Sequence, residues 1–345
     1  MAYLLIVIFF LSLFLTWGLK LYALAKNIID VPNHRSSHVK ITPRGGGLAF
    51  IVVFLLAVPF LGYFGFITLP TSILFGSCLL IVLLGLVDDF RGLSASTRLI
   101  GHFIASSSAL YLLGGMPSLN VLGWLVPASI YLNVLVVFYL VWLINLYNFM
   151  DGIDGIAAVE AITVSISAVI LYLLDNNYAL IGLPLVLGFA VAGFLYWNFP
   201  VARIFMGDSG SGFLGLFFGV LSIKSAWFDQ NLFWAFLILL GVFVVDATVT
   251  LFSRLFFGMK LSEAHKDHAY QHAATKISSH IKVTLSVLII NVFWLLPLSI
   301  LVVLGYLDGF FSLIVAYLPL IVLALRFKAG RNGKSTNKVV EYFPS

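Results

Sequence analysis

Long apolar stretches, separated by short polar ones, recur along almost the whole chain. A transmembrane helix needs roughly 20 mostly apolar residues, and the chain offers about eleven runs near that length. Apolar and polar residues do not alternate in segments of about ten, which argues against a transmembrane barrel. The pattern predicts an all-α polytopic integral membrane protein with about 10–11 transmembrane helices. The runs lie at residues 3–22, 47–66, 71–87, 99–114, 127–146, 156–174, 178–197, 210–226, 231–253, 282–303 and 309–326.

Composition indicates the same class. Hydrophobic residues make up 61% of the 345 residues and charged residues only 10%, and the mean hydropathy is +1.09. A soluble domain of this size needs far more charge on its surface. No polar segment is long enough for a separate soluble domain. We therefore expect one integral membrane domain over residues 1–326 and a short basic cytoplasmic tail over residues 327–345. The single cysteine, Cys78, can form no internal disulfide.

The positions of lysine and arginine predict how the chain lies in the membrane. Basic residues favour cytoplasmic loops, and here they cluster after the odd-numbered runs and in the tail. We therefore expect the N-terminus outside and the C-terminus inside. The first run has no basic residue before it and no small-residue cleavage site after it, which favours a retained helix over a signal peptide. The net charge of +5 reflects the loop bias and requires no nucleic-acid partner.

Acidic residues are divided unequally between the two sides of this topology. The outer side receives only three isolated carboxylates, whereas all seven histidines map to the inner loops or their margins. A transporter would be expected to carry ionisable groups near the midplane on broken helices. The asymmetry favours chemistry at the inner face over transport. The inner side receives Asp30, Asp88, Asp89, Asp151, Asp154, Asp208, Glu263 and Asp267.

Two acidic motifs follow predicted spans. In LVDDFRGLS, adjacent carboxylates stand at a helix end, where they repel each other unless a cation or a shared proton lies between them. A solvated helix terminus is the alternative. In NLYNFMDGIDG, amides and carboxylates recur every three residues, so they line one helical face or a turn opened by glycines. A capping and turn segment is the alternative there. The residues concerned are Asp88, Asp89, Asn145, Asn148, Asp151 and Asp154.

Two further motifs lie in the later inner loops. FMGDSGSGFLG sets Asp208 between small residues at the start of a span, where helix N-terminal amides can bind an anion. It lacks the Gly-Lys-Ser/Thr of a P-loop, and a plain helix cap is the alternative. AHKDHAYQHA brings His265, Lys266, His268 and His272 into one basic loop. Zinc is conceivable, but no cysteine joins these histidines, so an anion-binding role beside carboxylates is favoured.

Together the inner loops contain a central set of acidic residues with arginine, lysine and histidine around it. Carboxylate and amide oxygens suit Mg²⁺, which retains several waters and bridges to substrate phosphates. A basic rim suits the phosphates themselves. The expected chemistry is metal-assisted phosphoryl transfer at the membrane face, with a diphosphate substrate from the cytoplasm and a second partner entering sideways from lipid.

With these motifs the chain resembles the polyprenyl-phosphate N-acetylhexosamine-1-phosphate transferases. That family includes WecA-like enzymes and the MraY-like phospho-N-acetylmuramoyl-pentapeptide transferases. Five motifs in family order carry the resemblance and span most of the chain: HRSSHVKITPRGGGLAF, LVDDFRGLS, NLYNFMDGIDGIA, FMGDSGSGFLG and AHKDHAYQHA. The resemblance implies a Mg²⁺-dependent phosphoglycosyltransferase, with Mn²⁺ as a substitute ion. It transfers an N-acetylhexosamine-1-phosphate from a UDP-sugar to undecaprenyl phosphate, and UMP leaves. The resemblance also implies a bacterial inner-membrane location and contact with membrane lipids, and it allows a homodimer.

The resemblance also implies roles for individual residues. The metal ligands would be Asp208 and Asn148. The catalytic group would comprise Asp88, Asp89, Asp151, Asp154, His265 and His268. Asp88 and Asp89 would lie at the lipid phosphate. Asp151 and Asp154 would bind the nucleotide or shape the metal site. The substrate-binding group would comprise His38, Arg44, Asn145, Lys266 and His272. Because a phosphate monoester has a second pKa of about 6, the acceptor needs little deprotonation, which favours one in-line displacement over a covalent aspartyl intermediate.

One departure from the family pattern bears on the sugar. Many members have a denser histidine motif in the last large inner loop, and here Tyr270 and Gln271 interrupt it in HAYQH. The chain looks more like the WbpL-like branch that initiates O-antigen with a 6-deoxy-N-acetylhexosamine. A WecA-like enzyme using UDP-GlcNAc is the alternative, and a lipid-linked sugar transporter is the alternative from another class. Asp246, inside a predicted span, has either a structural or a functional role.

Overall fold

The chain forms a bundle of helices with two small hairpins, as seen in a computed structural model. The structure describes residues 1–32, 40–65, 67–76, 78–259 and 266–331. Two antiparallel hairpins pair β1 with β2 and β3 with β4. The strands are β1 (Ile29–Asp30), β2 (Thr42–Pro43), β3 (Leu119–Val121) and β4 (Trp124–Val126). The helices are α1 (Ala2–Ala25), α2 (Gly47–Tyr63), α3 (Leu69–Gly76), α4 (Leu79–Arg91), α5 (Ala95–Leu113), α6 (Ile130–Met150), α7 (Ile156–Leu174), η1 (Tyr178–Leu180), α8 (Gly182–Asn198), α9 (Asp208–Ala226), α10 (Gln230–Leu239), α11 (Gly241–Phe256), α12 (Ala269–Ile277), α13 (His280–Ile290), the π-helical η2 (Asn291–Leu295), α14 (Leu296–Val303) and α15 (Gly309–Arg326).

The all-α polytopic architecture is confirmed. Within the described residues, seven helices are long and apolar enough to cross a membrane, or eight if the bent pair α10–α11 is one span. The predicted runs outnumber these spans because the runs at 47–66, 71–87 and 99–114 correspond to α2, α3–α4 and α5, which are not among the candidate spans. The run at 71–87 is divided between α3 and α4, α2 is apolar but has only 17 residues, and the run at 231–253 bends by 65° between α10 and α11. The orientation and the division at residue 326 stay predictions.

Side-chain caps mark several helix starts, as the sequence rules expect. Ser94 Oγ accepts from the backbone N–H of Thr97 at the start of α5, and Ser129 Oγ accepts from Leu132 at the start of α6. Asp308 Oδ1 accepts from Phe311 at the start of α15. These caps hold the ends of apolar helices at the positions where polar loops begin.

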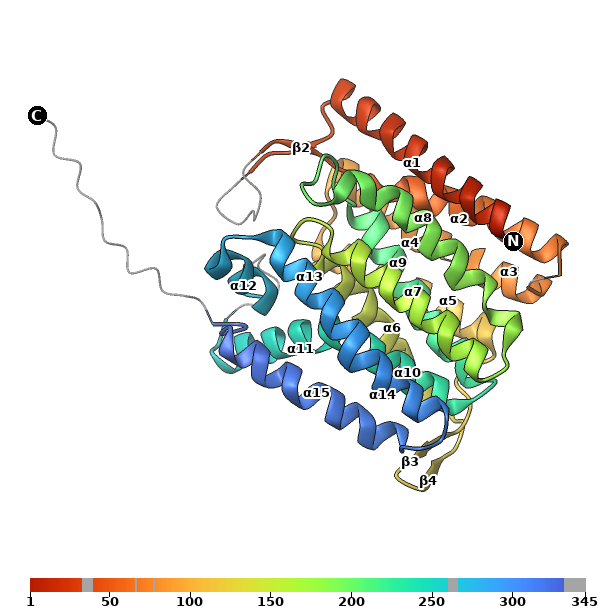
Figure 1. Cartoon of the computed structure of the whole chain (residues 1–345). Coiled ribbons are helices and arrows are strands. Elements are labelled where there is room, and N and C mark those ends of the chain that lie inside the picture. Colours follow the sequence, from red (N-terminus) through yellow and green to blue (C-terminus); the bar gives the residue numbers. More distant parts are fainter. Residues whose placement is uncertain (33–39, 66, 77, 260–265, 332–345) are drawn as a thin grey trace, which may run out of the picture.

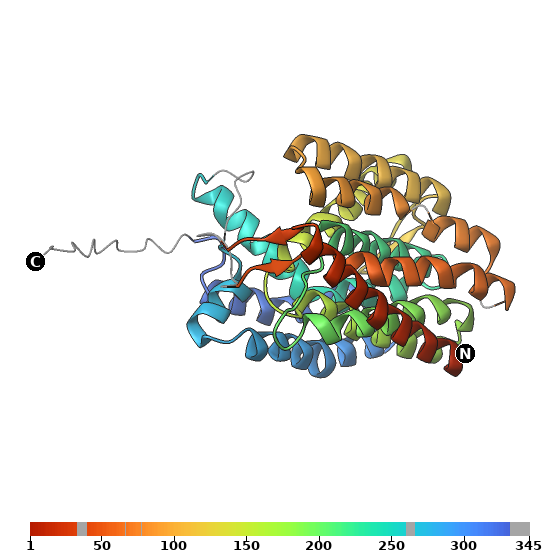
Figure 2. The same ribbon diagram turned by 90° about the horizontal axis from the view of Figure 1, so that it is seen from above.

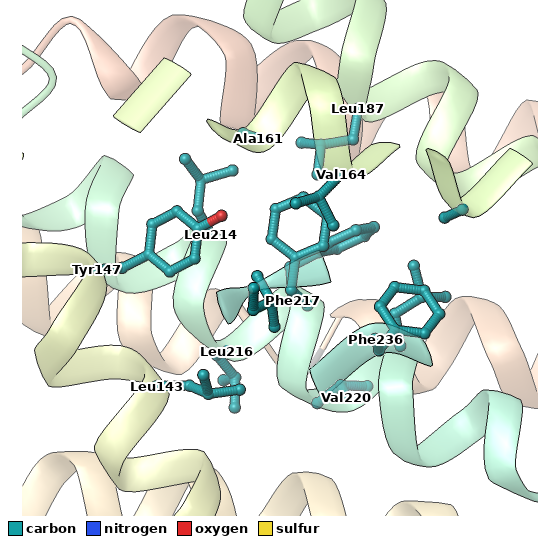
Figure 3. Close-up of a cluster of buried hydrophobic side chains, with 14 of the residues drawn as sticks. Leu143, Tyr147, Ala161, Val164, Leu187, Leu214, Leu216, Phe217, Val220 and Phe236 are labelled. Atoms are coloured by element: carbon teal, nitrogen blue, oxygen red, sulfur yellow. The ribbon is translucent and has the colours of Figure 1, made fainter. Parts of the chain in front are cut away.

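Helix α9 is the centre of the bundle. Nearly all of its side chains are buried, and α2, α4, α5, α6 and α10 all pack against it. Figure 3 shows Leu214, Leu216, Phe217 and Val220 of this helix surrounded by side chains from α6, α7, α8 and α10. The aromatic side chain of Phe217 contacts the rings of Phe54, Phe75 and Phe213. A central helix held on all sides gives its N-terminal residue, Asp208, a fixed position.

Small residues let neighbouring helices approach α9 closely. A Cβ built on Gly85 of α4 would stand 2.4 Å from Ser209 Cα, and one built on Gly215 would stand 2.4 Å from the Leu143 carbonyl oxygen. These are backbone contacts, which cannot move aside as a flexible side chain can. Close backbone approach through small residues is typical of helix packing in membranes.

Gly85→Ala should therefore displace α4 from the start of α9. We expect it to lower the unfolding free energy by about 1–3 kcal/mol, as overpacking usually does. The measurement is the thermal unfolding midpoint of the purified protein in detergent. Gly18→Ala is the matched control, because a Cβ there meets nothing within 4 Å. Equal unfolding midpoints for the two variants would contradict the close approach.

The two ends of the bundle differ in what they carry. Figures 1 and 2 place the β1–β2 hairpin and α12 at one end, with the end of α11 and the start of α13, and place α3 at the other. Backbone hydrogen bonds from Gly46 and Gly47 to Phe205 and Met206 bring the start of α2 to the loop before α9. The loops that carry the sequence motifs therefore gather at one end of the bundle.

Candidate active site

Asp89 holds the start of α9. Its carboxylate accepts hydrogen bonds from the backbone N–H of Asp208 (3.2 Å) and from the N–H and hydroxyl of Ser209 (3.3 and 3.2 Å). Helix N-terminal N–H groups favour such a negative partner. Gly207 immediately before the helix has φ +82°, and a Cβ there would stand 2.9 Å from the Asp89 carboxylate. The second acid of LVDDF therefore fixes the position of Asp208.

Asp88 is directed to a different partner. Its Oδ2 lies 3.1 Å from Nη1 of Arg98 on α5, and its Oδ1 accepts from the Leu93 backbone N–H at 2.6 Å. The same Arg98 nitrogen lies 3.8 Å from Asp208 Oδ2. The predicted repulsion between adjacent carboxylates is relieved because one pairs with a guanidinium and the other with backbone amides. Arg44, predicted to bind substrate, donates to the Asp89 backbone carbonyl.

Asp208 and Asn148 meet, as their assignment to one site predicted. Asn148 Nδ2 donates to Asp208 Oδ1 at 2.7 Å and to Ser211 Oγ at 3.2 Å. One helical turn earlier, Asn145 Nδ2 lies 3.2 Å from His102 Nδ1. These groups line a cavity of about 220 Å³, the acid pocket, between α4, α5, α6 and α9. Its polar lining residues are Asp88, Arg98, His102, Asn145, Asn148 and Asp208.

A larger cavity of about 550 Å³, the basic pocket, lies beside the next part of the motif. Asp154 lines it, and its Oδ2 lies 3.1 Å from His280 Nδ1 at the start of α13. Lys40 and Lys266 supply the positive lining, and the His280 ring with hydroxyls and backbone of the segment between α12 and α13 completes the wall. This cavity is large enough for a nucleotide-sized ligand.

Asp151 sits among the other acids. Burial raises the pKa of its carboxyl well above the usual range, and the nearby charges of Asp208, Asp89 and Asp154 raise that pKa further. Three carboxylates from three motifs are therefore close enough to Asp151 to act on it electrostatically. Such a concentration of negative charge is compatible with a bound cation or with a shared proton.

The histidine motif joins the acidic motif through α12. His268 stands at the N-cap of α12, and its ring centroid lies 6.1 Å from that of Phe149. Tyr270 Oη donates to the Phe149 backbone carbonyl at 2.9 Å. A Cβ on Gly152 would stand only 2.1 Å from Tyr270 Oη. Any larger residue at position 152 would therefore clash with the Tyr270 side chain. Tyr270 therefore connects HAYQH directly to NLYNFMDG.

Asp246 supports this motif from within α11. Its carboxylate accepts from His268 Nδ1 at 3.2 Å, from the backbone N–H of Ala269 and of Tyr270 at 2.9 Å each, and from Thr250 Oγ1 at 3.2 Å. Asp246 thus combines a structural role with a contribution to the candidate site: it caps the start of α12, and the same contacts orient the His268 ring. Further along α11, Arg254 pairs with Asp267.

The remaining predicted site residues fall into three groups. Lys266 lines the basic pocket. His272 points elsewhere: its Nδ1 donates to the Phe327 carbonyl at the end of α15, 2.7 Å away, and it lines neither of the two pockets. His38 and His265 lie outside the described residues. The structure thus brings most of the predicted residues together and sets His272 apart.

Whether the donor set fits a divalent cation can be judged from its chemistry. Among the described residues there is no group of three or more His, Cys, Asp or Glu side chains arranged for a metal ion. Mg²⁺ commonly binds one or two protein carboxylates, and waters and substrate phosphates fill its other positions. The carboxylate of Asp208, about one-third exposed, beside Asn148 and close to Asp88, fits that pattern.

Four residues at this end of the bundle were not assigned to the site from sequence. Arg98, His102, Asp246 and His280 each contact a predicted site residue. Arg98 and Asp246 carry a weak signal, since one is a cation near the acid pair and the other is an acid inside a span. His102 and His280 are single residues with no motif around them, so only their position in space reveals them.

Comparison with known proteins shows that this membrane-spanning helical bundle is a transferase. The model of glycosyl transferase family 4 matches residues 71–226, and the chain belongs to that family, in the WecA- and MraY-like group. It is 29% identical to a probable undecaprenyl-phosphate N-acetylglucosaminyl 1-phosphate transferase of Bacillus subtilis over 81% of this chain and 77% of the relative. It is 31% identical to a decaprenyl-phosphate N-acetylglucosaminephosphotransferase of Mycolicibacterium smegmatis, over 70% and 66%. A phospho-N-acetylmuramoyl-pentapeptide-transferase of Lactococcus lactis is 28% identical, over 66% and 71%.

Proposed function

We propose that this protein transfers an N-acetylhexosamine-1-phosphate from a UDP-sugar to undecaprenyl phosphate in the bacterial inner membrane. The product, a polyprenyl-diphosphate-linked sugar, initiates O-antigen or another cell-envelope polysaccharide. The observation that carries the proposal is that Asp151 lies close enough to interact electrostatically with both Asp208 of the acid pocket and Asp154 of the basic pocket, so the two pockets belong to one site. The names of the relatives support the same reaction class.

Each substrate is assigned to one pocket by size and charge. The UDP-sugar lies in the basic pocket, where Lys40, Lys266 and His280 face its phosphates and the volume suits a nucleotide. The phosphate of undecaprenyl phosphate enters the acid pocket, where Arg98 supplies positive charge between Asp88 and Asp208. Mg²⁺ held by Asp208 and Asn148, when bound, would neutralise phosphate charge and withdraw electron density from phosphorus.

The bond changes follow from the two substrates. An oxygen of the lipid phosphate attacks the phosphorus that carries the sugar, and a new P–O bond forms. The P–O bond to UMP breaks, and UMP leaves with the electron pair. Near neutral pH the lipid phosphate is largely dianionic, so the protein's residues mainly bind, orient and screen the two phosphates.

Carboxylate contacts favour this single displacement over an aspartyl intermediate. Both oxygens of Asp89 accept hydrogen bonds from the start of α9, and both oxygens of Asp88 are bound, to Leu93 and Arg98. A carboxylate engaged in this way is a poor nucleophile. Incubation with labelled UDP-sugar alone should therefore release no stoichiometric UMP, whereas a burst of one UMP per enzyme would indicate the covalent route.

The sugar is proposed from the histidine motif. The interrupted sequence HAYQH supports a 6-deoxy-N-acetylhexosamine, whereas the relatives named for N-acetylglucosamine support UDP-GlcNAc as a second candidate. Every 6-deoxy-N-acetylhexosamine lacks the hydroxyl that N-acetylglucosamine carries at C6. A pocket that hydrogen-bonds this hydroxyl would reject the 6-deoxy sugar strongly, while an apolar pocket would distinguish the two only weakly.

A substrate panel tests both the reaction and the sugar. Membranes with the protein, undecaprenyl phosphate, Mg²⁺ and one labelled UDP-N-acetylhexosamine at a time should transfer label to the lipid fraction and release UMP. The highest kcat/KM is expected with a 6-deoxy sugar. Higher kcat/KM with UDP-GlcNAc would favour the second candidate. Movement of lipid-linked sugar between leaflets without UMP release would favour a transporter instead. A homodimer stays a prediction.

A further inference from the structure

A row of polar contacts joins α7 and the segment just before it to α13 and η2 through an otherwise apolar region. Thr284 Oγ1 donates to the Asp154 carbonyl at 2.9 Å, just below the Asp154–His280 contact. Deeper in the bundle, Asn291 Nδ2 donates to Glu160 Oε2 at 2.6 Å and to Thr163 Oγ1 at 2.9 Å. Positions 280, 284 and 291 are four and seven residues apart, so they share one helical face.

Burial of the Glu160 side chain at this position is unfavourable for the free energy of folding. Its side chain is completely buried, its Oε2 is bound only by Asn291, and its Oε1 has no hydrogen-bond partner among the described residues. A buried ionisable side chain inside a membrane span usually lowers stability, and an apolar residue of the same size often replaces it without loss. The benefit of Glu160 therefore has to be sought in the geometry that it imposes.

The partner of Glu160 stands where the helix changes its winding. Asn291 is the first residue of the π-helical segment η2, which separates α13 from α14. A π-helical turn rotates the residues on either side of it relative to a regular α-helix. Because Glu160 and Thr163 both bind the Asn291 amide, they fix the rotation and depth of α13 against α7.

The other end of α13 is in the basic pocket. His280 is the first residue of α13 and lines that pocket together with Asp154. Any rotation or sliding of α13 would move the His280 ring away from Asp154 and change the pocket wall. The deep contact at Glu160 and the pocket contact at His280 are thus two ends of one helix.

We propose that Glu160 is a positioning residue for the donor pocket: through Asn291 it holds α13 in the register that sets His280 against Asp154, where His280 contacts the phosphates of the nucleotide sugar. This inference depends on the proposed function, because it assumes that the donor occupies the basic pocket. Glu160 itself touches no substrate.

The test compares Glu160→Leu, Glu160→Gln and His280→Ala in donor and acceptor titrations. Glu160→Leu should raise KM for the UDP-sugar roughly tenfold with kcat within about twofold, since it weakens binding of the donor. His280→Ala should do the same. Glu160→Gln keeps an oxygen acceptor for Asn291 and should restore the wild-type KM. In the double variant, Glu160→Leu should add almost nothing to His280→Ala, because both act through one ring.

Ser299→Ala is the matched control. It removes another fully buried hydrogen bond of the same span, to the Ala235 and Leu295 carbonyls, away from the basic pocket. It should leave both KM values unchanged. A Glu160→Leu effect that adds fully to that of His280→Ala, or that raises acceptor KM as much as donor KM, would overturn the proposal.

Binding of UMP, measured by calorimetry, separates failure of this inference from failure of the proposed function. If the wild type neither binds UMP nor uses any UDP-sugar, the proposed function is wrong. If the wild type binds UMP and Glu160→Leu binds it equally well, only the positioning role is wrong. Unfolding midpoints of all variants show whether each protein is folded at the assay temperature.

Discussion

Asp208→Asn should reduce transfer of sugar phosphate to the lipid by about 10³-fold, equivalent to about 4 kcal/mol of transition-state stabilisation. The proposed roles of this carboxylate are to bind Mg²⁺ and to face Arg98 in the acid pocket. Asparagine keeps the size and one oxygen but removes the negative charge, so metal affinity falls while the helix start stays in place. The measurement is label from a UDP-sugar in the lipid fraction at saturating substrate.

The fold should survive this change. Asp208 is about one-third exposed, and Asn148 can still donate to the remaining oxygen. We expect the unfolding midpoint to change by no more than a few degrees. Asp229→Asn is the matched control, since Asp229 caps α10 at its own start and retains an oxygen for the Asn231 N–H. If Asp208→Asn transferred sugar phosphate at the wild-type rate with normal Mg²⁺ dependence, Asp208 would have no role in metal binding or catalysis.

Asp246→Asn should damage both stability and activity. The aspartate accepts four hydrogen bonds, two of them from backbone N–H groups at the start of α12. Asparagine replaces one accepting oxygen by an NH₂ group that faces another donor. We expect a loss of about 2–4 kcal/mol in unfolding free energy. Transfer should fall by roughly 10²-fold, because His268 and Tyr270 lose their orientation.

Thr250→Val provides the comparison for this variant. It removes one hydrogen bond to Asp246 and leaves those to α12 in place. Its cost should be about 1 kcal/mol with nearly normal transfer, as for one net hydrogen bond. Thermal unfolding in detergent and single-turnover transfer are measured on the same preparations. An Asp246→Asn protein as active as Thr250→Val would mean that α12 needs no support from α11.

Much of the site could be predicted from the sequence because its motifs are local. LVDDF, NLYNFMDGIDG and FMGDSG each place polar residues beside an apolar run, and basic residues in the loops predict a common side. The structure confirms that Asp89, Asn148, Asp208 and His268 gather at one end of the bundle. Their catalytic roles, and the bound Mg²⁺, stay predictions.

Other assignments could not be separated by sequence. Asp88 and Asp89 are neighbours with the same chemistry, yet one pairs with Arg98 and the other binds the start of α9. His272 was expected beside His268, but it lies one turn further along, inside α12, where its Nδ1 donates to the Phe327 carbonyl. Adjacent positions on a helix point in directions about 100° apart, so only the packing of neighbouring helices assigns their partners.

The sequence by itself determined the membrane class, the helical architecture and the set of polar segments, because apolar run length and local spacing are properties of short stretches of chain. Only the tertiary structure decided where helices break and which acid is structural, and it alone revealed Arg98, Asp246, His280 and Glu160 as partners. Those choices depend on contacts between residues up to 131 positions apart. Such contacts arise when helices pack around α9, and no local pattern records them.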